Sequence, residues 1–295
     1  MSNGESVFLS APDGLKLHAR VWGAQHCDSV PVVCLPGLSR NTADFDGLAI
    51  TLAHDAIRPR RVLALDYRGR GASDYDRDPQ NYNLAVELAD VIAAVTALDA
   101  IPAVYVGTSR GGILTMLLAA ARPTLIAGAV LNDIGPVIEP GGLMRIKSYV
   151  GKLPEPRSFD EGADILRRLF SAQFPRLTAE EWLEAARQTW RRANGRLVLT
   201  YDARLRETLK AVDPEQPPPA MWNQFDALAG IPLMAIRGAN SDILSAQTLQ
   251  MMKARRKDLQ TIEVADQGHP PLLRGDLVAS ISDFVRRCGS LVAFL

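Results

Sequence analysis

The stretch that decides the fold is Gly107-Thr108-Ser109-Arg110-Gly111, a G-x-S-x-G pattern in a chain of 295 residues. A short apolar run at 103–106 precedes it, and a longer apolar run at 111–121 follows it. The first is typical of a strand buried on both faces, and the second of a helix packed against a sheet. A serine on a sharp turn between strand and helix exposes its hydroxyl near unpaired helix N–H groups. The pattern therefore predicts Ser109 as a nucleophile.

Further strand and helix signals alternate outward from this turn. The segment 6–22, with Pro12-Asp13-Gly14 at its bend, predicts a hairpin. Short apolar runs predict buried strands at 31–35, 61–65, 126–131, 232–236 and 261–264. Helical periodicity appears at 84–95, 246–254 and 277–287. Strands that alternate with helices predict an α/β fold with a mostly parallel sheet.

The middle of the chain has a different pattern. Strand signals are absent between 131 and 232, while two capping boxes, Ser158 with Glu161 and Thr178 with Glu181, predict helices. We therefore expect a helical cap over 135–228, inserted into a core formed by 1–134 and 229–295.

A serine nucleophile needs a base, and the base needs an acid that orients it. Of the four histidines only His269 follows Ser109, as the chain order Ser, acid, His requires. Two aspartates follow predicted strands between them. We favour Asp242 as the acid, and Asp133 is the alternative.

Acyl transfer also needs donors for the oxyanion. One is expected from the backbone N–H of Arg110, the residue after the nucleophile, and the other from the loop 35–41. The N–H of Leu38 is the favoured second donor, because Gly37 allows the backbone to approach closely.

Together these pieces resemble the α/β-hydrolase fold superfamily over essentially the whole chain, and within it the serine-nucleophile, esterase- or lipase-like branch. The run Asp66-Tyr67-Arg68-Gly69-Arg70-Gly71-Ala72-Ser73-Asp74 resembles the family's D-x-R-G-x-G-x-S turn, interpreted here as structural. The resemblance implies an eight-stranded, mostly parallel sheet flanked by helices. Pro36-Gly37 stands where many members have His-Gly. A serine at position 109 argues against the epoxide hydrolase and haloalkane dehalogenase branches, which use a carboxylate nucleophile.

The expected function is hydrolysis of carboxylic esters through an acyl-enzyme intermediate, a reaction that needs no cofactor or metal. One alternative is an enol-lactone or C–C bond hydrolase for a carboxylate-bearing substrate. Another is a ligand-binding homologue that does not turn substrate over.

Substrate contacts are expected from the loop and from the cap. The candidates are Ser39, Arg40, Asn41, Met144, Trp182 and Trp222. Arg40 and Arg110 flank the predicted oxyanion hole, so an inward-pointing guanidinium would bind a substrate carboxylate. Arginines at such positions are more often solvated or paired on the surface, and we favour that interpretation. For the cap residues, packing within the protein is an equally good interpretation.

Composition restricts the partners. Lys+Arg and Asp+Glu are both 33, which gives no positive excess for nucleic acid. No secretory signal and no run of ~20 apolar residues is visible, so no membrane span is expected. Three cysteines without C-x-x-C spacing suit a reducing compartment. We therefore expect a cytoplasmic protein that acts on a small-molecule ester; the oligomeric state stays open.

Overall fold

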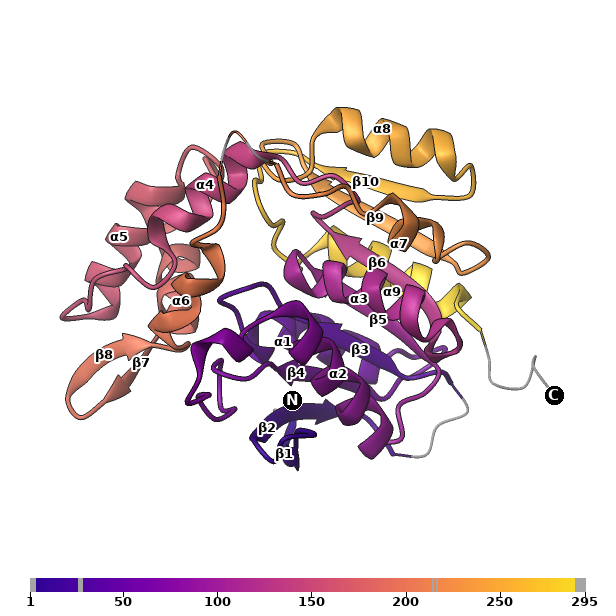
Figure 1. Ribbon diagram of the computed structural model, residues 1–295, viewed down its shortest axis with the longest axis horizontal. Coiled ribbons are helices and arrows are strands. Elements are labelled where there is room, and N and C mark those ends of the chain that lie inside the picture. The colour runs from indigo at the N-terminus through magenta and orange to yellow at the C-terminus, as the bar shows by residue number, and fades with distance from the viewer. Residues whose placement is uncertain (1–3, 26–28, 214, 216, 290–295) are drawn as a thin grey trace.

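The computed structural model describes residues 4–25, 29–213, 215 and 217–289. Eight of the strands in these ranges form one sheet, in the order β1-β2-β4-β3-β5-β6-β9-β10 (Figure 1). The pairs β1–β2 and β2–β4 are antiparallel, and the remaining neighbours are parallel. The strands are β1 (Glu5–Ser10), β2 (Lys16–Trp22), β3 (Val32–Leu35), β4 (Val62–Asp66), β5 (Ala103–Thr108), β6 (Ile126–Asn132), β9 (Leu233–Gly238) and β10 (Gln260–Val264). The predicted α/β-hydrolase architecture is confirmed.

Helices cover both faces of the sheet. On one face the core cluster includes side chains from α2 (Leu84–Ala97), α3 (Arg110–Ala121), α7 (Trp222–Asp226) and α8 (Ala246–Arg255). A second core cluster lies on the other face and includes side chains from α1 (Asp46–Ala53) and α9 (Asp276–Arg287). Central strand β5 is buried throughout because Tyr105 faces the first cluster and Val104 and Val106 face the second. This explains the continuous apolar runs in the sequence.

Ion pairs and hydrogen bonds hold the turn after β4 together, which agrees with the structural interpretation of this run. Arg68 binds both oxygens of Asp90 at 2.7 Å and also pairs with Asp76. Asp66 accepts hydrogen bonds from the backbone N–H groups of Thr42 and Ala72. These bonds fix the loop beside the carboxyl end of β4.

A segment over 140–209, called here the inserted segment, lies between β6 and β9 and gathers at one side of the sheet (Figure 1). It contains α4 (Pro140–Tyr149), α5 (Phe159–Phe170), α6 (Ala179–Thr189), β7 (Trp190–Ala193), β8 (Arg196–Leu199) and the 3₁₀ helix η4 (Ala203–Leu209). Helices α5 and α6 and the β7–β8 hairpin form a separate hydrophobic cluster around Trp190.

Two details differ from the expected helical cap over 135–228. The β7–β8 hairpin interrupts the helices, with Asn194 and Gly195 both at positive φ in its turn. Helix α7 packs against α3 in the main core. The part that packs separately from the core therefore ends well before residue 228.

Within the described residues, no helix is long and apolar enough to cross a membrane. Cys34 and Cys288 are buried free thiols, and burial raises the pKa of Cys288 to about 11. Cys27 lies outside the described residues.

Candidate active site

The candidate residues meet at one edge of the sheet. Ser109 follows β5, Asp133 follows β6, and the loop containing Gly37 follows β3. Asp242 lies beyond β9 and His269 beyond β10. Because the carboxyl ends of parallel strands share an edge, residues distant in sequence come together there.

Ser109 and His269 are in direct contact. The Ser109 Oγ lies 2.8 Å from Nε2 of His269. The imidazole is buried, while Ser109 is half-buried at the start of α3. This is the contact in which a hydroxyl passes its proton to an imidazole as it attacks.

The other ring nitrogen of His269 contacts Asp133, at 2.7 Å from Nδ1 to Oδ2. Asp133 is fully buried and also accepts hydrogen bonds from the Gly238 backbone N–H at 2.8 Å and the Ser241 hydroxyl at 2.5 Å. Since a carboxylate only accepts, Nδ1 is assigned as the donor, which leaves Nε2 free to accept from Ser109.

The expectation that Asp242 orients His269 is therefore wrong, and the alternative residue occupies that position. Asp133 follows β6 directly at φ +56°, a backbone conformation fixed by its carboxylate bonds to the β9 loop. Asp242 is turned toward the inserted segment. It accepts two hydrogen bonds from Arg145 of α4, at 2.6 and 2.8 Å.

The turn at Ser109 is strained and depends on glycine. Ser109 has φ +52° and ψ −112°, a region that L residues rarely occupy. A Cβ on Gly111 would lie 2.0 Å from the Leu35 carbonyl oxygen, and one on Gly107 would lie 2.5 Å from Gly111. Strand β5 and helix α3 therefore approach each other too closely for a side chain at either glycine.

The two predicted oxyanion donors lie beside Ser109. A Cβ on Gly37 would be 3.9 Å from the Ser109 Cβ, which places the Leu38 peptide next to the nucleophile. Neither the Leu38 nor the Arg110 amide donates a hydrogen bond to another described residue. The two amides are therefore available to an oxyanion.

A buried ionic network supports both of these residues. The Arg70 Nε donates to the Leu38 carbonyl at 2.8 Å. The Arg110 Nε donates to Glu87 at 2.5 Å, and Arg70 Nη1 lies 2.8 Å from the same carboxylate. Burial alone would raise the pKa of Glu87, but Arg110 and Arg70 outweigh it and lower that pKa. Glu87 thus links the two peptides that flank the serine.

The loop after β3 contacts the inserted segment. Arg40 pairs with Asp44 and donates to Gln188 at 2.8 Å. Asn41 is buried and caps the turn at Ala43 while also donating to Thr200. Ser39 is half-buried between β3 and this contact. Arg40 and Arg110 each pair with a carboxylate of the protein, which agrees with the paired interpretation and not with the inward one.

The two tryptophans expected to bind substrate pack elsewhere. Trp182 is buried in the separate cluster of α5 and α6. Trp222 packs edge-on against Phe225 and lies 5.1 Å beneath the guanidinium of Arg255. Met144 is half-buried on α4. The contacts of Trp182 and Trp222 are therefore structural.

Several site residues were not predicted. Gln173 follows α5, and its Oε1 accepts from the His269 backbone N–H at 3.4 Å. Arg145 and Tyr149 on α4 lie beside Asp242, with the Tyr149 ring 6.0 Å from the guanidinium. The sequence held no helix signal for α4 beyond Pro140, which suits a first helical position.

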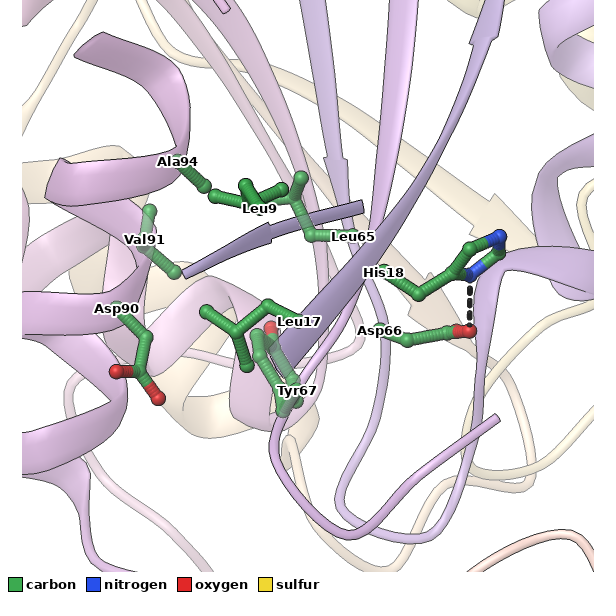
Figure 2. A pocket seen from close by; sticks show the side chains of 9 residues that line it. All are labelled: Leu9, Leu17, His18, Leu65, Asp66, Tyr67, Asp90, Val91 and Ala94. Carbon is green, nitrogen blue, oxygen red and sulfur yellow. Dashed lines mark hydrogen bonds and ion pairs between the residues drawn. The ribbon is translucent and has the colours of Figure 1, made fainter. Parts of the chain in front are cut away.

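A second Ser-His-Asp contact occurs at the carboxyl end of β4. His18 lies 2.7 Å from Asp66 and 3.0 Å from the Ser6 hydroxyl. Figure 2 shows His18 and Asp66 beside a cavity of about 10 Å³ that also contacts α2. Ligand sites are typically of order 300–1,000 Å³. Ser6 also lies within a strand, where no helix start supplies unpaired N–H groups. Similar side-chain distances alone therefore do not make this a catalytic site.

The family model described as "Alpha/beta hydrolase family" matches residues 32–281. The chain belongs to this family.

Individual relatives agree with that assignment. The chain is 33% identical over 273 residues to a 3-hydroxybutyrate-oligomer hydrolase of Cupriavidus necator, which covers 90% of this chain and 91% of the relative. It is 26% identical over 235 residues to a 2-(acetamidomethylene)succinate hydrolase of Mesorhizobium japonicum, 79% of each chain. A solved α/β hydrolase from Novosphingobium aromaticivorans superposes with a TM-score of 0.89 at 39% identity, over 97% of this chain and 99% of that one. The chain is a hydrolase of this family.

Proposed function

We propose that the protein is a serine esterase in which Ser109 is the nucleophile, His269 the base and Asp133 the acid that orients the base. The observation that carries this proposal is the continuous contact from Ser109 Oγ through both nitrogens of His269 to Asp133, at 2.8 and 2.7 Å. The three side chains come from the ends of three strands of one sheet, which fixes their mutual geometry.

The reaction follows from this arrangement. Ser109 Oγ attacks the ester carbonyl while its proton moves to Nε2 of His269. The Leu38 and Arg110 amides stabilise the oxyanion. The alcohol leaves with the proton from His269, and a water activated by the same nitrogen then hydrolyses the acyl-enzyme. Asp133 stabilises the imidazolium that forms between these steps.

For the substrate, we propose a short oligoester of a hydroxy acid. The Cupriavidus relative, whose name states such a substrate, aligns with nine-tenths of this chain. We further propose that the inserted segment acts as a cap, because Gln173 and Arg145 extend from it to the loops that carry His269 and Asp242.

The experiment is hydrolysis of a 3-hydroxybutyrate dimer together with fluorophosphonate labelling. Wild type is expected to hydrolyse the dimer and to label at Ser109, and Ser109→Ala to do neither. Asp133→Asn is expected to lower kcat by about 10⁴-fold, as for loss of a triad acid. Asp226→Asn, at a surface pair with Arg255, is the matched control and keeps wild-type kcat.

Two results would contradict the assignment. Labelling at a residue other than Ser109 would refute the nucleophile. A loss of kcat in Asp242→Asn as deep as in Asp133→Asn would return the acid to the position first expected from the sequence.

A further inference from the structure

One candidate oxyanion donor lies in a loop segment that contains glycine. The Leu38 N–H belongs to the peptide between Gly37 and Leu38, and it donates to no other described residue. Glycine has wide conformational freedom, so the direction of this N–H depends on what fixes the neighbouring peptides. An amide stabilises an oxyanion best when it is already oriented before the reaction.

The carbonyl groups around this peptide are all held. The Leu38 carbonyl accepts from Nε of Arg70 at 2.8 Å. The Pro36 carbonyl accepts from the Tyr67 hydroxyl at 3.2 Å, and the Gly37 carbonyl accepts from a backbone N–H of the same loop at 3.2 Å. Tyr67 and Arg70 both belong to the turn after β4. That turn therefore fixes the peptides on both sides of the Leu38 N–H.

The two donors of this turn are themselves fixed. Both side chains are buried, and the Arg70 guanidinium lies 5.5 Å from the Tyr67 ring. Nη1 of Arg70 donates to the Arg68 carbonyl at 2.7 Å and lies 2.8 Å from Glu87. Burial raises the pKa of Tyr67, so its hydroxyl keeps the proton that it donates to Pro36.

The backbone around Arg70 pairs with the inserted segment. The Gly71 N–H donates to the Thr200 carbonyl at 2.8 Å, and the Asp202 N–H donates to the Gly69 carbonyl at 2.8 Å. Between these bonds Arg70 forms a bridge with Tyr201. The sheet and the inserted segment therefore determine the position of Arg70 together.

Charge balance alone does not account for Arg70. Glu87 is fully buried and pairs with both Arg70 and Arg110, although one guanidinium would neutralise it. Arg70 is fully buried as well, and burial lowers the pKa of its guanidinium. A buried charge beyond a neutral pair costs free energy, and residues that disfavour folding in this way are expected at functional sites.

We propose that Arg70 and Tyr67 are positioning residues of the oxyanion hole, which orient the Leu38 N–H through the carbonyl groups of Leu38 and Pro36. This inference rests on the proposed function. Each residue acts through the loop rather than on the substrate. Their loss is therefore expected to lower kcat more than to raise KM, because the donor matters most when the carbonyl oxygen becomes negative.

The test measures hydrolysis of p-nitrophenyl butyrate and inhibition by butylboronic acid. Arg70→Met removes one donor, while Arg110 still balances Glu87. This variant is expected to lower kcat by about 10- to 100-fold, with KM near the wild-type value. Tyr67→Phe removes only a hydroxyl and is expected to cause a smaller loss of kcat; it carries the test if Arg70→Met does not fold.

The boronic acid separates positioning from general damage to the fold. It forms a tetrahedral adduct with a serine hydroxyl and so resembles the oxyanion intermediate. Its inhibition constant is therefore expected to rise in each variant by the factor by which kcat/KM falls. Urea unfolding of each variant shows that the measured protein is folded.

Arg61→Met is the matched control. Arg61 is also buried and donates to backbone carbonyls, those of Leu98 and Asp99, but it lies at the opposite end of β4. Its kcat and inhibition constant are expected to stay at the wild-type values. Wild-type values in folded Arg70→Met and Tyr67→Phe, or an equal loss in Arg61→Met, would overturn the inference and leave the esterase assignment intact. Absence of ester hydrolysis in wild type would instead refute the proposed function, and the inference with it.

Discussion

Glu87 is a single buried carboxylate that faces two guanidinium groups. It is fully buried, and so is Arg70, while Arg110 is mostly buried. Removing one member of a buried ionic group leaves charge without compensation inside the protein. A change at Glu87 is therefore expected to affect both the stability of the protein and the positions of the Leu38 and Arg110 peptides.

We expect Glu87→Gln to destabilise the protein by about 3–5 kcal/mol at pH 7. The exposed Glu155→Gln is the matched control and is expected to stay within about 0.5 kcal/mol of wild type. Urea unfolding of all three proteins measures the difference. A Glu87→Gln protein as stable as wild type would show that the network contributes nothing to folding.

The same pair of proteins gives a pH prediction. The folded-state pKa of Glu87 is lowered, so its contribution is complete above the unfolded pKa of a glutamate, about 4.3. It is lost as the pH falls through the lower folded-state pKa. The stability gap between wild type and Glu87→Gln is therefore expected to be constant from about pH 5 to 8 and to narrow below about pH 4. A gap that widened with acidity would contradict the assigned direction.

The base of the candidate site could be predicted from the sequence, but its acid could not. The chain order identified His269, since no other histidine follows Ser109. It did not separate Asp133 from Asp242, because both follow strands that end at the same edge of the sheet. Which aspartate contacts His269 depends on the direction of each side chain. Hydrogen bonds from the Ser241 hydroxyl and the Gly238 amide orient Asp133. The ion pair with Arg145 orients Asp242 toward α4.

At the junction of β5 and α3 there is no space for a side chain at Gly107 or Gly111. We expect Gly111→Ala to destabilise the protein by about 1–3 kcal/mol and to reduce activity sharply, because its Cβ would displace the Leu35 carbonyl. Gly47→Ala in α1 is the control, since a Cβ there meets nothing within 4 Å, and it is expected to be neutral or stabilising by up to about 1 kcal/mol. Thermal unfolding and ester hydrolysis report both effects. Wild-type behaviour of Gly111→Ala would exclude the close approach.

Elements of the core were predictable where burial on two faces imposed a pattern. The strands β3, β4, β5, β6 and β9 read as short apolar runs because both of their faces are covered. The hairpin β7–β8 was missed because Trp182, Ala186 and Trp190 continue a helical stripe. The Asn194-Gly195 pair, typical of a tight hairpin turn, was the signal that could have located it.

At the scale of the whole molecule, apolar side chains gather in more than one place. The clusters on the two faces of the sheet share the central strands, whereas the cluster of α5, α6 and the hairpin has its own set of side chains. An ion pair from Arg274 to Glu181 of α6 and a hydrogen bond from Arg40 to Gln188 of α6 link this third cluster to the loops of the core.

A part of the chain with its own small interior can open without the rest. We expect amide hydrogens in α5 and α6 to exchange with deuterium faster than those in β5 and β6, with an opening free energy below that of global unfolding. Equal protection in both regions would show one cooperative unit. If the two regions exchange separately, a destabilising substitution in α5 or α6 is expected to unfold only that region. The sheet and the loops that carry Ser109, Asp133 and His269 would then stay folded.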